Sequence, residues 1–340
     1  MTDAPLRTGF TTGACATAAC KAALTGLWGG ALPDAVTIAL PRGQTPRFAV
    51  VDARRGDGWA EAGIVKDAGD DPDVTHGATV RVRVTPSAGG VVFRAGEGVG
   101  TVTKPGLPLA VGEPAINPVP RAMMDEVVAE LAVRFERSPD VAITVAIPGG
   151  AAIAERTWNP RLGIAGGLSI LGTTGIVRPF SCAAWIASIH RGVDVARASG
   201  LDHVAGCTGA TSERVVQTMH GLPDHAMLDM GDFAGGLLKY LAKHPVPRVT
   251  VGGGIGKMTK LAQGALDLHS GRSRVDFRAL SDWAGSDLTG CNTALEAVGR
   301  APVLARIVAD RARARVGGIV AADVDVVVID RAGTVLAHAP

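Results

Sequence analysis

The sequence predicts two domains of different classes, an α+β domain with a mixed or antiparallel sheet and then an α/β, Rossmann-like domain. A chain of 340 residues is long for one hydrophobic core. Its first half has short β-like runs among few helices, whereas in its second half strands recur about every 22 residues with helices between them. We place the first domain at 1–158, a glycine-rich interdomain segment at 159–181 and the second domain at 182–340.

The elements expected in the first half begin with a helix. Thr11 and Thr12 supply a cap, a run of alanines follows, and Gly26 closes the helix. Next come β-like runs separated by Pro/Gly turns, at 35–40, 47–52, 80–84 and 91–94. An amphipathic helix at 123–135 and an apolar strand at 141–147 complete an α+β pattern.

The second half alternates regularly between helices and strands. The expected strands lie at 203–205, 226–230, 248–251 and 323–329, the last with a partner at 334–337. The expected helices lie at 181–198, 212–220, 232–243, 257–267, 292–298 and 302–316. This alternation is typical of βαβ units in a parallel sheet.

The composition excludes several classes of function. Hydrophobic residues make up 47% of the chain and charged residues 19%, which suits a globular protein. The net charge is only +2 and aromatic residues are 4%, so neither a basic footprint nor stacking platforms for nucleic acid are expected. The N-terminus does not resemble a signal peptide, and no apolar run reaches the length of a membrane span.

The cysteines and histidines predict neither a disulfide framework nor a metal site. The five cysteines are odd in number and form no C-x-x-C pair, and the eight histidines form no H-E-x-x-H. Reduced thiols of this kind are typical of the cytoplasm, so a cytoplasmic protein with no resident metal is expected.

Two glycine-containing loops in the second half follow predicted strands, where ligands bind in sheets of this type. The first has Gly206, Thr208, Gly209 and Thr211 before a helix, and about 20 residues later Asp229 ends the next strand, at ribose-binding distance. The second loop is GGGIG, in which Gly252 and Gly254 are candidate cofactor-binding residues. Ordinary loops without a ligand are the alternative for each. Neither loop is a full G-x-G-x-x-G with an acidic partner, so NAD is not indicated.

An acidic loop at 66–77 offers candidate catalytic carboxylates. Asp67, Asp70, Asp71 and Asp73 fall within seven positions, and neighbouring like charges raise one another's pKa, which prepares a general base. The spacing does not fit a calcium-binding EF-hand loop, and a solvated turn is the alternative.

The glycine-rich run at 96–106 lacks the G-K-[ST] end of a P-loop, so nucleotide hydrolysis is disfavoured.

Several of these segments, in this order, resemble the CbiD family of cobalt-precorrin-5B C(1)-methyltransferases. The matching stretches include VKDAGDDPDVTHG at 65–77, GEGVGTVTKPGL at 96–107 and WNPRLGIAGGLSILGTTGIVRPFS at 158–181. TGFTTGACATAACKAA at 8–23, INPVPRAMM at 116–124 and GKMTKLAQGALDLHS at 256–270 extend the resemblance over nearly the whole chain. At 177–181 this chain departs from the acidic residues that family members often carry.

The resemblance implies transfer of a methyl group from S-adenosyl-L-methionine to C-1 of a tetrapyrrole that carries its own cobalt, in oxygen-independent cobalamin biosynthesis. Lys66, Lys104, Arg121 and Arg161 are then candidates to bind the carboxylate arms of the macrocycle. We also expect a group of small residues to line a cleft between the domains: Gly166, Gly167, Thr173, Thr174 and Gly175. The alternative is a linker packed for structural reasons alone.

Two other functions stay open at this stage, an NAD(P)-dependent reductase of the same pathway and a non-catalytic tetrapyrrole-binding protein. The expected partner is a small-molecule tetrapyrrole, with room for transient contact with neighbouring pathway enzymes.

Overall fold

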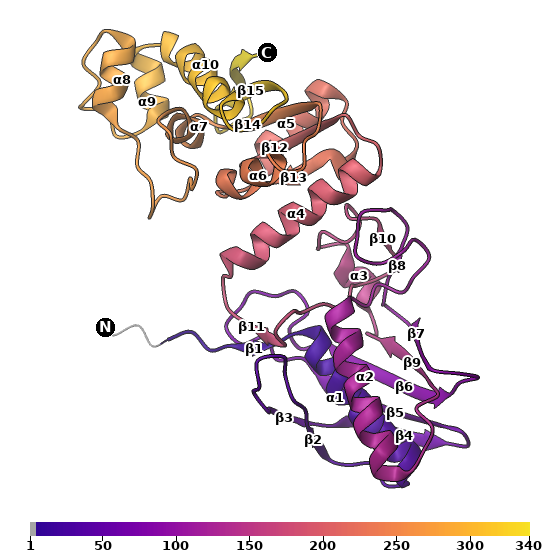
Figure 1. Ribbon diagram of the computed structural model, residues 1–340. Coiled ribbons are helices and arrows are strands. Elements are labelled where there is room, and N and C mark those ends of the chain that lie inside the picture. Colours follow the sequence, from indigo (N-terminus) through magenta and orange to yellow (C-terminus); the bar gives the residue numbers. More distant parts are fainter. Residues whose placement is uncertain (1–4) are drawn as a thin grey trace. The chain divides into compact units, whose positions relative to one another are not determined.

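The computed structural model describes residues 5–340, and the chain divides into two compact units, Met1–Ser181 and Cys182–Pro340. Both are mixed α/β structures with mixed sheets (Figure 1). The first four residues of the predicted first domain lie outside the described residues. Within residues 5–340, no helix is long and apolar enough to cross a membrane. Residues 159–181, expected to be a separate segment, belong to the first unit.

The first unit is built on a five-stranded sheet in the order β4-β5-β6-β9-β7. Its neighbours are antiparallel except β7 and β9, which are parallel. The strands are β4 (Val51–Gly56), β5 (Trp59–Val65), β6 (Thr79–Pro86), β7 (Val91–Ala95) and β9 (Val141–Ala146). β5 was not expected from the sequence, because its buried run of small residues lacks the usual alternation of polar and apolar side chains.

Three short two-stranded pairs surround this sheet. They pair the beginning of the unit with its end (β1 with β11), the glycine-rich segment with residues 101–102 (β10 with β8), and β2 with β3. Their bounds are β1 (Gly9–Phe10), β2 (Ala35–Thr37), β3 (Arg47–Ala49), β8 (Thr101–Val102), β10 (Ile164–Ala165) and β11 (Ile176–Val177).

Helices α1 (Thr12–Gly29) and α2 (Pro118–Phe135) pack against each other, and α1 also packs on β5 and β6 (Figure 1). The Thr11 side chain accepts a hydrogen bond from the backbone N–H of Ala14, as expected for an N-cap. The helix continues past Gly26 and ends at Gly30, which adopts the left-handed conformation (φ 81°). Two prolines in the first turn of α2 lose no hydrogen bond, since the N–H groups there have no partner within the helix. The short helix α3 (Gly150–Ala154) completes the unit.

The second unit contains a five-stranded sheet in the order β13-β12-β14-β15-β16. The first four strands are parallel, and β16 is an antiparallel edge strand, as expected for the predicted partner of 323–329. The strands are β12 (His203–Cys207), β13 (Met227–Asp229), β14 (Arg248–Gly254), β15 (Asp323–Ile329) and β16 (Val335–Ala339). The sheet is therefore largely parallel, and the finer assignment of a Rossmann-like domain stays a prediction.

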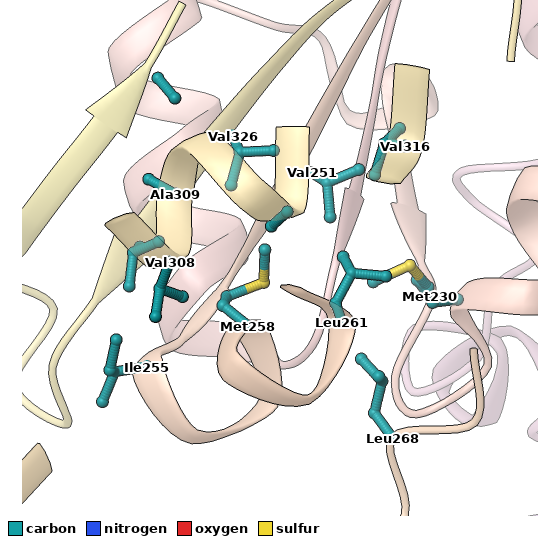
Figure 2. Packing of buried hydrophobic residues seen from close by; sticks show 14 of the residues in the cluster. Met230, Val251, Ile255, Met258, Leu261, Leu268, Val308, Ala309, Val316 and Val326 are labelled. Carbon is teal, nitrogen blue, oxygen red and sulfur yellow. The ribbon is translucent and has the colours of Figure 1, made fainter. Parts of the chain in front are cut away.

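The helices of this unit connect the strands and cover the sheet. They are α4 (Cys182–Ala198), α5 (Ala210–His220), η1 (Asp224–Ala226), α6 (Ala234–Leu241), α7 (Ile255–Ala262), α8 (Phe277–Ala284), α9 (Ala294–Arg300) and α10 (Val303–Gly317). Figure 2 shows Met258 and Leu261 of α7 packed among Val251, Val308 and Val326. Burial of side chains of this size stabilises a fold by about 1.5–3 kcal/mol each.

The strand order reverses around β12, because the chain passes from β12 to β13 on one side and then to β14 on the other. The ends of β12 and β14 flank this reversal, which is where open parallel sheets bind ligands. Both strands are longer than predicted. β12 continues through Gly206, and β14 includes the glycines of residues 252–254. At Gly206, Gly252 and Gly253 the lack of a side chain leaves room for neighbouring side chains.

Candidate functional site

The acidic loop at 66–77 is bound to the N-terminal segment of the first unit. The guanidinium of Arg7 forms an ion pair with the carboxylate of Asp67, with Nη2 2.9 Å from Oδ1. The backbone N–H of Arg7 donates to Oδ2 of Asp70 at 2.6 Å, and the N–H of Asp70 donates to the Arg7 carbonyl at 3.0 Å. A side chain on Gly9 or Gly69 would collide with the backbone of the opposite segment. These contacts hold the first turn of the loop, from Asp67 to Asp70, against the N-terminal segment.

Two carboxylates of this loop, Asp67 and Asp73, have lowered pKa values, where the sequence pattern predicted a rise. The hydrogen bond from Arg7 lowers the pKa of Asp67 to about 2, helped by the N–H of Gly69. Burial acts to raise the pKa of Asp73, but Lys66 and hydrogen bonds from Thr75 outweigh it, so that the pKa is lowered. Each of these two carboxylates has a cation and hydrogen-bond donors beside it, which favour its charged form. Asp67 and Asp73 are consequently anions near neutral pH and weak proton acceptors.

Lys66 is buried, with 2% of its side chain exposed. Its ammonium pairs with the carboxylate of Asp73 and donates to Oγ1 of Thr75 at 2.6 Å. Thr75 in turn donates to Oδ1 of Asp73 from its hydroxyl at 2.6 Å and from its backbone at 2.8 Å. Lys66 thus neutralises a carboxylate of its own loop, and its burial argues against the predicted contact with substrate. Burial also raises the pKa of the nearby Cys15 thiol to about 12, which keeps it protonated.

The middle of the acidic loop contacts the segment at 177–181, where this chain departs from the family pattern. The backbone N–H of Phe180 donates to Oδ1 of Asp71 at 2.9 Å. Phe180 has a positive φ of 54°, and its ring is largely exposed. Leu6, next to Arg7, and Val74, within the loop itself, are also exposed. The loop is thus accompanied by apolar side chains open to solvent.

The glycine-rich segment is fixed to the first turn of α1. The N–H of Thr11 donates to the carbonyl of Gly175 at 3.0 Å, and the N–H of Gly13 donates to the carbonyl of Leu171 at 3.0 Å. The hydroxyl of Thr12 lies 3.2 Å from both the backbone N and O of Leu171. Gly172 has a φ of 134°, and a side chain there would strike Thr11. The segment is a structural part of the first unit.

The small residues predicted to contact substrate fall into two groups. Gly167 and Gly175 are buried, and a Cβ would collide with neighbouring backbone at Gly167 and with a leucine side chain at Gly175. Gly166 and Thr173 are exposed, and no described atom lies within 4 Å of a Cβ built on Gly166. The half-buried Thr174 accepts from a backbone N–H two residues later at 3.3 Å. The exposed group can meet a ligand, and its predicted place in a cleft stays a prediction.

The basic candidates also differ from one another. Arg121 donates to two backbone carbonyls at 2.8 and 3.1 Å and to the carboxylate of Glu113 at 2.8 Å, so its guanidinium is engaged within the unit. Lys104 is half-buried, with its alkyl chain packed beside a glycine. Arg161 lies 5.3 Å above the ring of Trp158. Arg121 is therefore set aside, and the binding of substrate carboxylates by Lys104 and Arg161 stays a prediction.

In the second unit, three of the predicted ligand-binding strand ends are adjacent. Cys207 at the end of β12 is in register with Asp229 of β13 on one side and with Gly252 of β14 on the other. Trp185 of α4 donates from Nε1 to the carbonyl of Asp229 at 3.0 Å. The carboxyl ends of these strands therefore form one continuous edge.

The glycines along this edge have different roles. Gly206 and Gly252 are buried in strands, where a side chain would strike Leu237 and Val216 respectively, so we assign them to packing. Gly209 and Gly254 precede α5 and α7, and no described atom lies within 4 Å of a Cβ built on either. The first N–H groups of each helix have no acceptor within the helix. Close approach of a ligand is thus sterically allowed at these two glycines.

A lysine that the sequence did not single out connects two of the loops. Nζ of Lys257 donates to the carbonyl of the buried Thr208 at 2.9 Å and lies 3.0 Å from Oδ1 of Asp232. Thr211, another residue predicted to bind the cofactor, is half-buried in the first turn of α5. Lys257 stands beside the GGGIG run, but no local pattern predicts its contact with a loop 49 residues earlier.

A cleft of about 490 Å³ lies elsewhere in this unit. It is lined by the last turn of α7 and by basic and aromatic side chains, including Lys260, Arg274, Trp283 and Arg315. The residues that line this cleft include none from the two predicted ligand-binding loops, which lie near the other end of α7.

The sequence of this chain is similar to proteins of one family. The family model described as CbiD matches residues 1–179. A protein of Paramagnetospirillum magneticum, named cobalt-precorrin-5B C(1)-methyltransferase, is 57% identical over 98% of both chains. A protein of the same name from Brucella anthropi is 55% identical over 98% of this chain and 96% of its own. A crystal structure of a cobalamin biosynthesis protein (cbiD) from Archaeoglobus fulgidus is 23% identical, covers 94% of this chain and 86% of that one, and has a TM-score of 0.43.

Proposed function

The chain belongs to the CbiD family, and from this premise we propose that it methylates C-1 of cobalt-precorrin-5B to give cobalt-precorrin-6A. The observation that carries the proposal is the 57% identity, over 98% of both chains, to a relative named cobalt-precorrin-5B C(1)-methyltransferase. The activity is thus that of a methyltransferase in cobalamin biosynthesis. The reductase and the non-catalytic binding protein have no comparable support.

S-adenosyl-L-methionine is the donor we propose, and when bound it supplies a methyl group on a positively charged sulfur. In the reaction the bond from sulfur to the methyl carbon breaks, and a bond from that carbon to C-1 forms. The sulfur keeps the electron pair of the broken bond, and the macrocycle restores its charge by losing a proton. Cobalt belongs to the substrate and takes no part as a resident metal.

We assign the donor to the carboxyl edge of the sheet in the second unit. Gly209 and Gly254 leave space beside the first turns of α5 and α7, whose N–H groups suit a carboxylate. Asp229 is half-buried on the neighbouring strand end, where an acidic side chain accepts hydrogen bonds from ribose hydroxyls. The residues along this edge therefore fit the two polar ends of the donor.

We assign the macrocycle to the first unit. A tetrapyrrole is a flat apolar ring with carboxylate arms, so it requires apolar surface together with donors. The exposed Gly166 and Thr173 provide close approach to the backbone, and Lys104 and Arg161 provide positive charge. Phe180, beside Asp71 on the acidic loop, provides an exposed ring for apolar contact.

The acidic loop is better suited to hold charge than to accept a proton. The lowered pKa values of Asp67 and Asp73 keep them ionised, and fixed anions stabilise positive charge in a site from which water is excluded. Asp70, which is exposed, is the carboxylate to test. We expect Asp70→Asn to lower kcat by about 100-fold, the scale of acid–base and electrostatic effects, with little loss of stability. Normal turnover by this variant would assign the loop a structural role only.

The direct test is turnover with purified cobalt-precorrin-5B and S-adenosyl-L-methionine that carries a ¹³C-methyl group. We expect one labelled methyl group per macrocycle and a new ¹³C signal at C-1, with S-adenosylhomocysteine released in equal amount. NADPH in place of the methyl donor should give no product. Reduction of the substrate by NADPH would support the reductase, and tight substrate binding without turnover would support the binding protein.

A further inference from the structure

Two histidines contact one buried carboxylate in the second unit, away from the carboxyl edge described above. Asp325 of β15 has 2% of its side chain exposed. Nε2 of His220, the last residue of α5, and Nε2 of His338 in β16 each lie 3.1 Å from its Oδ2. The ligating atoms of these three residues all lie within 4.8 Å of one another.

Nε2 of His338 lies at hydrogen-bond distance from Oδ2 of Asp325, whereas Nε2 of His220 forms no hydrogen bond with a described residue, and the three ligand atoms fit one shared metal. Bonds of about 2.0–2.1 Å in a tetrahedron place neighbouring ligand atoms about 3.3 Å apart, close to the 3.1 Å that separates each histidine nitrogen from Oδ2. The side chain of His220 is 10% exposed, and among the described residues its Nε2 has no hydrogen-bond partner. The nitrogen is thus near the carboxylate oxygen without directing an N–H bond at it, as expected for two atoms that share a metal.

The other oxygen of Asp325 is held by an outer group of residues. The Thr250 hydroxyl donates to Oδ1 at 2.5 Å, and because it has one proton, it must accept from Nε2 of His203 at 2.7 Å. Nε of Arg248 lies 3.7 Å from the same Oδ1. These contacts orient the carboxylate and leave Oδ2 for the two histidines, which is how outer residues usually support metal ligands.

We propose that His220, Asp325 and His338 bind one Zn²⁺ ion, with water as the fourth ligand. Two imidazoles and one carboxylate are typical zinc ligands, and a dication balances the charge of a carboxylate that is almost fully buried. The ligands come from α5, β15 and the edge strand β16, so the ion links the C-terminal strand to the rest of its unit. No sequence pattern predicts this site, since its ligands are 13 or more residues apart and fit no zinc motif.

The test uses the full chain, stripped with a chelator and dialysed against Zn²⁺. We expect one zinc per chain by elemental analysis and a rise in melting temperature with added Zn²⁺, since a ligand that binds the folded state stabilises it. Mg²⁺ at the same concentration should produce no rise, because it prefers oxygen ligands.

His338→Gln and His220→Gln should each weaken zinc binding by at least about 100-fold, since even loss of an outer partner costs about 10–100-fold. His269→Gln, at an exposed position in the same unit, is the matched control and should bind zinc as the unchanged chain does. His338 is about one-third exposed, so its variant is expected to fold even if His220→Gln does not. Failure of the unchanged chain to retain zinc, or equal retention by His338→Gln, would overturn the proposal.

Discussion

The ion pair of Lys66 and Asp73 gives the sharpest test of how the acidic loop is held. Asp73→Asn keeps the shape of the side chain but leaves the ammonium of Lys66, of which 2% is exposed, beside a neutral amide. Removal of one partner from a buried pair costs about 3–5 kcal/mol. Because 24% of the Asp73 side chain is exposed, we expect about 2–4 kcal/mol at pH 7. The cost of deprotonating a free lysine at this pH, about 4.6 kcal/mol, is an upper limit.

The measurement is urea denaturation of the full chain, with hydrogen exchange of β5 and β6 to report on the first unit separately. Asp57→Asn, in the exposed turn between β4 and β5, is the matched control and should change stability by less than about 0.5 kcal/mol. A loss below about 1 kcal/mol for Asp73→Asn would show that the charge of Lys66 is satisfied without Asp73.

The same pair predicts a dependence on pH. The pKa of Asp73 is lower in the folded chain than in the unfolded one, because Lys66 and Thr75 outweigh the effect of burial. Its stabilisation is therefore complete above the unfolded pKa of about 3.9 and is lost as the pH falls through the lower folded pKa. The difference in stability between the unchanged chain and Asp73→Asn should shrink as the pH falls below about 4.

Three further predictions concern the proposed ligand sites and one close backbone contact. Asp229→Ala should weaken binding of S-adenosyl-L-methionine by about 10-fold or more in calorimetry, the cost of a lost hydrogen bond to a charged group, and unchanged affinity would reject the donor site. Thr173→Val, at the exposed position assigned to the macrocycle, should raise the KM for the corrinoid by about 5-fold and leave donor affinity unchanged, whereas equal losses for both ligands would indicate a general structural effect. Gly98→Ala should cost at least about 1–3 kcal/mol in thermal unfolding, because φ is 70° and the added Cβ would strike the Ile147 carbonyl. Gly112→Ala, with a positive φ but no described atom within 4 Å of the added Cβ, separates strain from collision.

Local patterns predicted much of the fold. The Thr11 cap located the start of α1, and the apolar run at 323–329 matched β15 at both ends. β5 was missed, because a strand that buries small residues in succession has no period of two. Gly206 was expected to break β12, yet it continues the strand, since a neighbouring leucine occupies the space that its side chain would fill.

The candidate sites were less accessible to sequence reasoning, because their contacts join distant parts of the chain. The four aspartates of the acidic loop were recognised as a group, but their charge state depends on Arg7, which lies 60 residues before Asp67. Lys66 was expected to face a ligand, and only the fold shows that Asp73 and Thr75 enclose it. The pairing of Asp325 with His220 and His338 likewise depends on where α5 and β16 lie against β15.

The pairing of β1 with β11 has a consequence for synthesis of the chain on the ribosome. Gly9 pairs with Val177, and Phe10 pairs with Ile176, so the first strand finds its partner only when nearly the whole unit has been translated. At about 5–20 residues per second, β1 waits many seconds for β11, although its other partner, the acidic loop at 66–77, is translated earlier. We therefore expect nascent chains stalled before residue 177 to protect β1 from protease less than chains released after it do.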